Sequence, residues 1–423
     1  MISRSLSLLA VLFFISCGTL TQPATSSRPR YDLQPWLDQA AQVLARPDLA
    51  RATAFVAADR ETILDEWHTI SRIPAPSGQE AERAELVVRL LREAGLQPLR
   101  DAASNIFVTL GGNRAGRHVV FDAHLDTVFP AGTDLTTRIE TGRIHGPGVG
   151  DNTRNVVALL AMIRAMRAAE VDLSGSITFL FSVEEETTFK GIHQFLADRG
   201  DTIDAFVALD GGYGDFTYGG IGIYWDRYHV DGPGGHTRSP TPPWSATVAV
   251  ARAIDRISRL EIPDNAWVNV GMLGAGEVFN AKASEAWMSV DLRSSDGKTL
   301  HGLDREVETI VREEAARLGM SMRRERVSRS EVAKIEGHRT SPMVLATEAV
   351  WRTFGFRPRI ADTASNHSSV ALLAGIPAIS TGVTPCSNAH ALRENCAIEP
   401  IFTGISRNIA LAVMLASPRE EQQ

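Results

Sequence analysis

The sequence predicts an α/β protein with a mostly parallel central sheet and a separate α+β module inserted into the chain. Two observations predict this class. Between about residues 100 and 210, apolar strand-like runs alternate with helical patterns, as they do where helices connect parallel strands. From 221 to about 332 the pattern changes to strand, helix, two strands and helix, and the first pattern resumes near residue 340. The module therefore interrupts one domain.

The elements of the first domain can be located in order. Apolar residues at helical spacing run from 60 to 94 and end at Gly95. Two β-rich segments follow, NIFVTLGG and HVVFDAHLDTVF, and a turn-rich GRIHGPGVGD then precedes the helical NVVALLAMIRAMRAA. The strand SITFLFSV runs directly into three glutamates, and DAFVALDGG reads as the next strand. The C-terminal part resumes with a helix and the strand AGIPAISTGV.

The inserted module has its own order of elements. Its helices read SATVAVARAIDRISRL and LDREVETIVREEAARLG, and its two middle strands read AWVNVGMLG and EAWMSVDLRS. We therefore expect a small α+β unit.

Composition and charge exclude one class of function. The chain has 423 residues, of which 44% are hydrophobic and 22% charged, as in ordinary globular proteins. The formal net charge is −7, and acidic and basic residues are mixed throughout. A nucleic-acid binder would show a basic stripe, so we exclude that class.

The N-terminus resembles an export signal. One arginine precedes an apolar stretch, residues 6–15, that is too short to span a bilayer. Cys17 follows a small residue, Ser16, and resembles the lipidated cysteine of bacterial lipoproteins; the alternative is an ordinary cleaved signal. We predict a lipoprotein-type signal peptide at 1–17 and a flexible tether, rich in Ser, Thr and Pro, at 18–35. The protein would then reside in the bacterial cell envelope, facing the periplasm, and contact the membrane only through its lipid.

Cys386 and Cys396 lie ten residues apart. In an oxidising compartment they could form a disulfide, and they could equally be two buried thiols. The sequence leaves both possibilities open.

The segment FDAHLDT contains a candidate metal ligand. His124 is followed two residues later by Asp126, and period-2 geometry places both on one face of a strand. An imidazole that binds zinc commonly donates its other N–H to a carboxylate. A purely structural His–Asp pair is the alternative. Asp122 lies nearer the start of the strand, and we expect it to be solvated.

Three more candidates lie where strands end or the next helix begins. Asp151 precedes a long helix and could simply cap it, Asp210 follows an apolar strand, and His390 lies in a polar loop. Combined with His124 and one of the three glutamates, they supply two imidazoles and three carboxylates. That set suits two zinc ions with one bridging carboxylate, and a remaining glutamate would be the general base on the metal-bound water.

The ordered motifs HLDT, GPGVGD, the acidic triplet, ALDGG and NAH resemble those of the M20 zinc peptidases, which include peptidase T and carboxypeptidase G. The likeness runs from about residue 70 to the C-terminus. It implies a zinc-peptidase catalytic domain formed by residues 36–221 and 335–418, with a lid and dimerisation domain at 222–334. It also implies a set of metal ligands, namely His124, Asp151, Glu186, Asp210 and His390.

The resemblance assigns further roles within the catalytic domain. Glu185 becomes the general base, and Asp126 orients His124. A one-residue shift in the alignment would instead make Glu184 the base and Glu185 the ligand. His367 stands where relatives often have Asp, so no role is carried over to that position.

The lid is also implied to hold functional residues. HVDGPGGHTRSP resembles the segment whose histidine, here His236, reaches across a homodimer to polarise the scissile carbonyl. GEVFNAKASEAWMSVDLRS resembles the stretch whose Asn280 and Arg293 contact substrate. Alternatively, Arg293 pairs with Asp291 or Glu285.

The sequence therefore favours a two-zinc metallopeptidase, with cobalt or manganese as other possible metals. We expect an aminopeptidase, similar to a tripeptidase, that hydrolyses short peptides through a metal-bridging water and Glu185. The first alternative is an N-acyl amino-acid deacylase or a carboxypeptidase on the same scaffold. The second is a surface lipoprotein that binds peptides without cleaving them.

Overall fold

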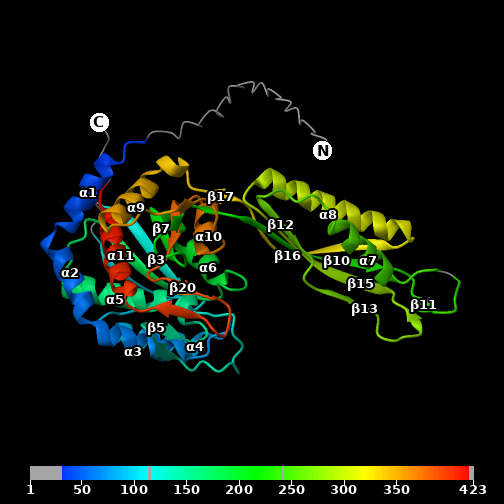
Figure 1. Cartoon of the computed structure of the whole chain (residues 1–423), viewed down its shortest axis with the longest axis horizontal. Helices are drawn as coiled ribbons and strands as arrows, with labels where there is room; N and C mark the ends of the chain where they lie inside the picture. The colour runs from blue at the N-terminus through cyan, green and yellow to red at the C-terminus, as the bar shows by residue number, and fades with distance from the viewer. Residues whose placement is uncertain (1–30, 113–115, 241, 419–423) are drawn as a thin grey trace, which may run out of the picture. The chain divides into compact units, whose positions relative to one another are not determined.

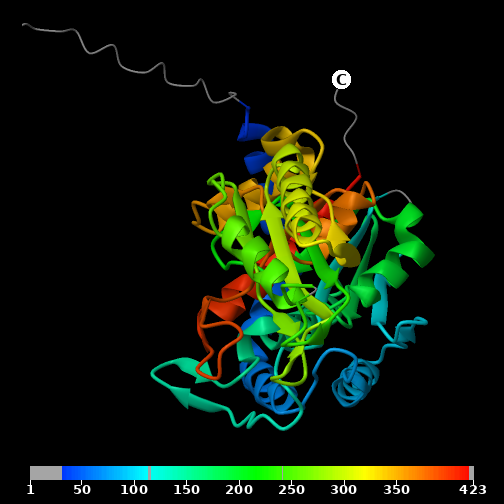
Figure 2. The ribbon, with the colours of Figure 1, turned by 90° about the vertical axis from the view of Figure 1, so that its right-hand side faces the viewer.

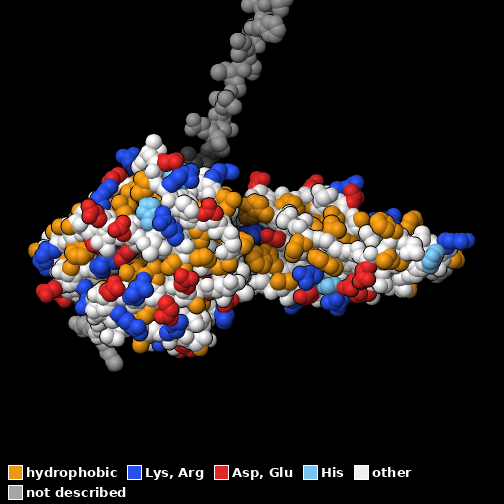
Figure 3. Space-filling model, turned by 90° about the horizontal axis from the view of Figure 1, so that it is seen from below, with side chains coloured by type: hydrophobic (Ala, Val, Ile, Leu, Met, Phe, Trp, Pro, Cys, Tyr) orange, Lys and Arg blue, Asp and Glu red, His pale blue; other side chains and the backbone are white. Residues whose placement is uncertain are grey.

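The computed structural model describes residues 31–112, 116–240 and 242–418. The predicted signal peptide with Cys17, and most of the predicted tether, lie outside these residues. Within them, no helix is both long enough and apolar enough to cross a membrane. Acidic and basic side chains are interspersed over the face drawn in Figure 3, in line with the mixed charge of the sequence.

An eight-stranded sheet forms the centre of the larger part of the fold (Figure 1). Its strands, in spatial order, are β1 (Leu99–Arg100), β2 (Ile106–Gly111), β6 (Ser176–Ser182), β3 (His118–His124), β7 (Ala205–Leu209), β19 (Ala378–Thr381), β8 (Phe216–Thr217) and β18 (Ile360–Ala361). The four central strands, β6, β3, β7 and β19, are parallel to one another. The predicted mostly parallel sheet is confirmed.

The central strands explain why the candidate residues can meet. Every residue of β3 after His118 is buried, as continuous apolar runs are when a sheet is covered on both faces. His124 is the last residue of β3, the three glutamates follow β6, and Asp210 follows β7. Because these strands are parallel, their carboxyl ends lie at one edge of the sheet, where sites in α/β proteins form.

Helices cover the sheet in two groups. They are α1 (Gln34–Leu44), α2 (Pro47–Ala58), α3 (Arg60–Ser71), α4 (Ala81–Glu93), α5 (Arg154–Ala168), α6 (Lys190–Arg199), α9 (Pro342–Thr353), α10 (His367–Leu373) and α11 (Pro400–Ala416). Helices α5 and α11 contact each other and strand β3, and α1, α2, α3 and α9 pack around them. Helices α6 and α10 lie over the face that carries Phe107 and Asp122, because Phe107 packs against Phe195 and Asp122 pairs with His367.

The helical segment predicted for residues 60–94 consists of two helices, α3 and α4. They are separated by a stretch that contains Pro74 and Pro76, which lack the N–H that a helix interior needs. Gly95 has a φ of 74°, a left-handed value that suits the glycine that ends α4.

The inserted module is an antiparallel sheet with two helices packed on it. Its elements are β10 (Gly222–Asp231), α7 (Ala246–Ile257), β12 (Ala266–Asn269), β13 (Leu273–Ala275), β15 (Glu285–Ser294), α8 (Gly297–Arg317) and β16 (Ser321–Ser330). The strand order is β12-β15-β10-β16, with β13 also paired to β15. Helices α7 and α8 lie side by side against this sheet (Figures 1 and 2).

The module has a hydrophobic core of its own, which includes Tyr224, Tyr228, Met288 and Leu300. Short strands β9 (Gly219–Gly220) and β17 (Ala333–Lys334) pair just before β10 and just after β16. A second short pair, β11 (Gly235–His236) and β14 (Ala281–Lys282), lies within the module. The exact domain limits at 222 and 334 stay a prediction.

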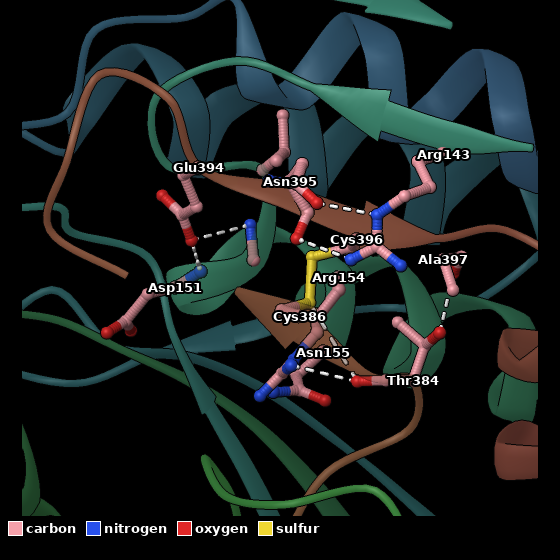
Figure 4. The surroundings of a disulfide bond; sticks show 12 residues. Arg143, Asp151, Arg154, Asn155, Thr384, Cys386, Glu394, Asn395, Cys396 and Ala397 are labelled. Carbon is pink, nitrogen blue, oxygen red and sulfur yellow. Dashed lines mark hydrogen bonds between the residues drawn. A yellow bond between two sulfur atoms is a disulfide. The ribbon is translucent and has the colours of Figure 1, made fainter. Parts of the chain in front are cut away.

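A small sheet holds the loop that carries His390. Its strands are β4 (Arg138–Glu140), β5 (Arg143–His145), β20 (Cys386–Ser387) and β21 (Asn395–Ala397), in the order β20-β21-β5-β4. Cys386 and Cys396 are directly opposite in the β20–β21 pair and form a disulfide (Figure 4). The question that the sequence left open is thereby answered.

Replacing both cysteines with alanine should lower the free energy of unfolding by about 3 kcal/mol, because the crosslink restricts a short loop in the unfolded chain. Denaturant unfolding of the oxidised wild type and the Cys386→Ala/Cys396→Ala protein measures this difference. Wild type treated with a reductant is the matched control and should unfold like the double variant. Equal stability of all three samples would contradict the prediction.

Candidate metal centre

His124 is held at the end of β3 by Asp126. Its side chain is buried, and Nδ1 lies 3.3 Å from Asp126 Oδ1 and 3.1 Å from the Asp126 carbonyl oxygen. Asp126 lies just beyond the strand rather than on it, and its carboxylate also accepts bonds from Ser77 Oγ and from the N–H groups of Glu185 and Glu186. An Nδ1–H donated to Asp126 leaves Nε2 with its lone pair free to bind a metal.

Asp151 lies between the two candidate histidines. Its backbone is not helical (φ −104°, ψ 97°), and α5 begins only at Arg154, so Asp151 does not cap that helix. Oδ1 lies 3.2 Å from His124 Nε2, and Oδ2 lies 3.0 Å from His390 Nε2. One carboxylate oxygen therefore faces each imidazole.

The three glutamates point in different directions. Glu184 has a left-handed φ of 55°, and its carboxylate binds Lys190 at 2.8 Å and Thr188 at 3.0 Å. Glu185 Oε2 lies 3.9 Å from His124 Nε2, whereas Glu186 Oε1 lies 3.3 Å from His390 Nε2. Of the three, Glu185 and Glu186 face the candidate histidines.

Two groups of donor atoms are close enough to hold a metal ion. The first group consists of one donor atom each from His124, Asp151 and Glu186, and the second of one each from His124, Glu185 and Asp210. Within each group, the donor atoms lie within 4.8 Å of one another. The four carboxylates of these groups line a cavity of about 290 Å³, together with His390. The remaining lining is small and polar and includes Thr363, Ser365, Asn366 and Ser380.

The electrostatics of the cavity favour cations. His124 Nε2, Asp151 Oδ1 and Glu186 Oε1 are buried without a hydrogen-bond partner. Burial, with the charge of Asp151 as the next cause, raises the pKa of Glu186 to about 7 and that of Asp210 to about 6. Two dications would balance four carboxylates, and imidazole and carboxylate donors suit zinc.

Comparison with known proteins identifies the family. The model of peptidase family M20/M25/M40 matches residues 120–412, which is most of the chain. The chain belongs to this family. It is therefore a hydrolase that acts on peptide bonds, and the resemblance inferred from the motifs is confirmed.

Solved structures share the fold of this M20 peptidase. A tripeptidase from Staphylococcus aureus matches with a TM-score of 0.74 and 20% identity, over 84% of this chain and 98% of that one. The aminopeptidase PepT from Bacillus cereus matches with a TM-score of 0.70 and 18% identity, over 85% and 99%. In sequence, carboxypeptidase G2 from a Pseudomonas species is 25% identical over 189 residues, which cover 43% of this chain and 45% of that protein.

The expectation that Asp122 is solvated is wrong. The Asp122 side chain is buried and accepts a hydrogen bond from Ser182 Oγ at 2.6 Å, and its Oδ2 lies 2.8 Å from His367 Nδ1. Helix α10 brings His367 over this face of β3, so the carboxylate has partners without water. His367 is itself buried and does not line the cavity; it pairs with a strand residue instead.

The residues predicted in the lid lie outside the cavity lining. His236 is exposed on β11, which pairs with β14; it lies opposite Ala281, the residue that follows Asn280. Arg293 pairs with Asp291 at 3.0 Å, as the structural alternative anticipated. None of the cavity-lining residues in the described chain comes from 222–334.

The sequence analysis missed two polar residues near the centre, the partly buried Arg154 and the buried Glu394. Arg154 donates to the carbonyl oxygens of Thr384 and Gly211, and Glu394 accepts hydrogen bonds from the turn before Asp151. A glutamate placed four residues after His390 and close to a buried cysteine was a possible signal for Glu394. Its partners are more than 240 residues away in sequence, so no local pattern identifies them.

Proposed function

We propose that this M20 peptidase is a two-zinc aminopeptidase that cleaves short peptides, as a tripeptidase does. The observation that carries the proposal is the position of Asp151, with one oxygen toward His124 and the other toward His390. Each histidine has a further carboxylate beside it, Asp210 near His124 and Glu186 near His390, which supports two metal sites with Asp151 as the shared ligand.

These distances support one division of the donors between two metals. His124 and Asp210 would hold one metal, His390 and Glu186 the other, and Asp151 would bridge them. Bound zinc supplies Lewis-acid chemistry, which polarises an amide carbonyl and lowers the pKa of a coordinated water. Cobalt or manganese could occupy the same donors.

Glu185 is the proposed general base. Its carboxylate is buried beside His124 and Asp210, within a group of donor atoms that could itself hold a metal ion. We assign it as the base because each proposed metal site already has one imidazole and two carboxylates. It takes a proton from the attacking water and passes it to the leaving amine. Asp126 holds His124 in the tautomer that binds metal, and its bonds to the N–H groups of Glu185 and Glu186 fix the glutamate loop.

The proposal includes a homodimer formed through the lid. His236 of a second copy would donate a hydrogen bond to the developing oxyanion, with Asn280 beside it and Arg293 near the substrate. The exposure of His236 on β11 supports this, because a residue that serves another copy must be accessible.

Cleavage next to a free N-terminus is the preferred specificity. It is supported by the fold shared with the tripeptidase and with PepT. The sequence relation to carboxypeptidase G2 favours the alternative, carboxypeptidase or deacylase action on the same scaffold.

The proposed location is the bacterial cell envelope, with the protein exported and held by a lipid on Cys17. The disulfide between Cys386 and Cys396 supports export, because such bonds persist in oxidising compartments.

A peptide assay tests the function. Soluble protein that begins after Cys17 is given a tripeptide and its N-acetylated form, each with and without a chelator followed by added zinc. We expect hydrolysis of the free tripeptide only, lost on chelation and restored by zinc. Cleavage of only the acetylated form would move the function to a deacylase or carboxypeptidase. No cleavage of either, with zinc bound, would favour a peptide-binding lipoprotein.

A further inference from the structure

Glu394 is a buried carboxylate that takes no part in the proposed chemistry. Its side chain is fully buried in the loop closed by the disulfide (Figure 4). Oε2 accepts the N–H of Gly148 at 2.7 Å, and Oε1 accepts those of Gly150 at 3.0 Å and Asp151 at 2.7 Å. Three main-chain N–H groups of one turn therefore converge on a single carboxylate.

The turn is shaped around Glu394. Gly148 adopts a left-handed φ of 71°, and a Cβ on Gly150 would lie 2.5 Å from Glu394 Oε1 and 2.8 Å from Cys396 Sγ. Only glycine fits at position 150, because the carboxylate and the disulfide both press against it. Asp151 follows with its non-helical backbone, and its N–H is bound by Glu394.

Glu394 joins the chain segment that carries Asp151 to the segment that carries His390. His390 lies four residues before it in the same loop, with a side chain that is 53% exposed. The backbone bond from Gly146 N–H to the Glu394 carbonyl, at 3.0 Å, adds a second tie between these segments. The distance of 3.0 Å between Asp151 Oδ2 and His390 Nε2 depends on how they are held together.

We propose that Glu394 is a positioning residue, which fixes Asp151 relative to His390 and thereby sets the affinity of the metal pair. This inference rests on the proposed two-metal function. A carboxylate is needed because it offers two acceptor oxygens and no donor. Glutamine would turn an NH₂ group toward one of the turn's N–H groups and lose at least one of the three bonds.

The test is a zinc titration of metal-free protein, followed by competition with a chromophoric chelator. Wild type is measured first and should bind two equivalents. In Glu394→Gln we expect the weaker equivalent to lose about 10- to 100-fold in affinity, the usual effect of removing a group that orients a metal ligand. Glu399→Gln is the matched control. Glu399 is an exposed carboxylate in the same region, and among the described contacts it pairs only with Arg60. The zinc affinities of this variant should equal those of wild type.

The outcomes separate the possibilities. A folded Glu394→Gln protein that binds both zinc equivalents with wild-type affinity, whatever its melting temperature, would overturn the inference and leave the proposed function intact. Wild type that binds no zinc would overturn both. If the glutamine variant does not fold, Glu394→Asp is titrated in its place. Aspartate keeps the charge and is one methylene shorter, so we expect the same loss of zinc affinity. Unchanged affinity in Glu394→Asp would overturn the inference.

Discussion

Replacing Glu185 with glutamine should lower kcat by about 10²- to 10⁴-fold while the protein still binds two zinc ions. Glutamine keeps the size of the side chain and removes its ability to accept a proton. The neighbouring Glu186, the proposed metal ligand, keeps its place, because Asp126 still binds the N–H groups of both residues. Steady-state kinetics on a tripeptide, with zinc content measured on the same sample, checks the prediction.

Glu184→Gln is the matched control for this experiment. It makes the same chemical change one residue earlier, on a side chain that binds Lys190 and Thr188 instead of facing the histidines. Activity should stay near that of wild type. A reversed result, with Glu184→Gln inactive and Glu185→Gln active, would show that the alternative alignment of the triplet is correct.

Much of the fold could be predicted because its elements differ in local pattern. The buried strands β3, β6 and β7 are mostly apolar, and α5 and α8 show helical spacing over several turns. Strand β16 was missed for a physical reason. Its sequence, SMRRERVSRS, has arginines where strands usually have apolar residues, and Arg324 and Arg329 instead form ion pairs with Asp226 and Asp304.

The candidate site could be predicted as a set of residues but not as a geometry. The positions of His124, Asp151, Asp210 and His390 followed from motifs at strand ends. The choice between two alignments of the glutamates depends on side-chain direction, which the structure shows through the contact of Glu184 with Lys190. The roles assigned to these residues stay predictions until they are tested.

Long-range pairs account for the failures at single residues. Asp122 was expected to be solvated because it lies nearer the start of its strand than His124. Its partner His367 comes from 245 residues later and reaches it only because α10 packs on the sheet. Glu394 was overlooked in the same way, since its partners are backbone N–H groups, which leave no trace in residue type.

Asp151→Ala should weaken the binding of both zinc ions and lower activity by on the order of 10³-fold. The metal pair would supply several kcal/mol of stabilisation to the charge of the transition state. The variants Asp210→Ala and Glu186→Ala remove a carboxylate from one side only. Each variant should bind one zinc ion more weakly and bind the other with near wild-type affinity. Zinc stoichiometry by metal analysis and affinity by chelator competition distinguish the two patterns.

The difference between these patterns tests the bridge itself. Asp151 has one oxygen at 3.2 Å from His124 and the other at 3.0 Å from His390, so its loss reaches both sides of the cavity. Asp134→Ala, at an exposed turn, is the control for a removed surface carboxylate and should bind zinc as wild type does. If Asp151→Ala lost one ion and kept the other at full affinity, Asp151 would serve a single metal and the shared-ligand geometry would be wrong.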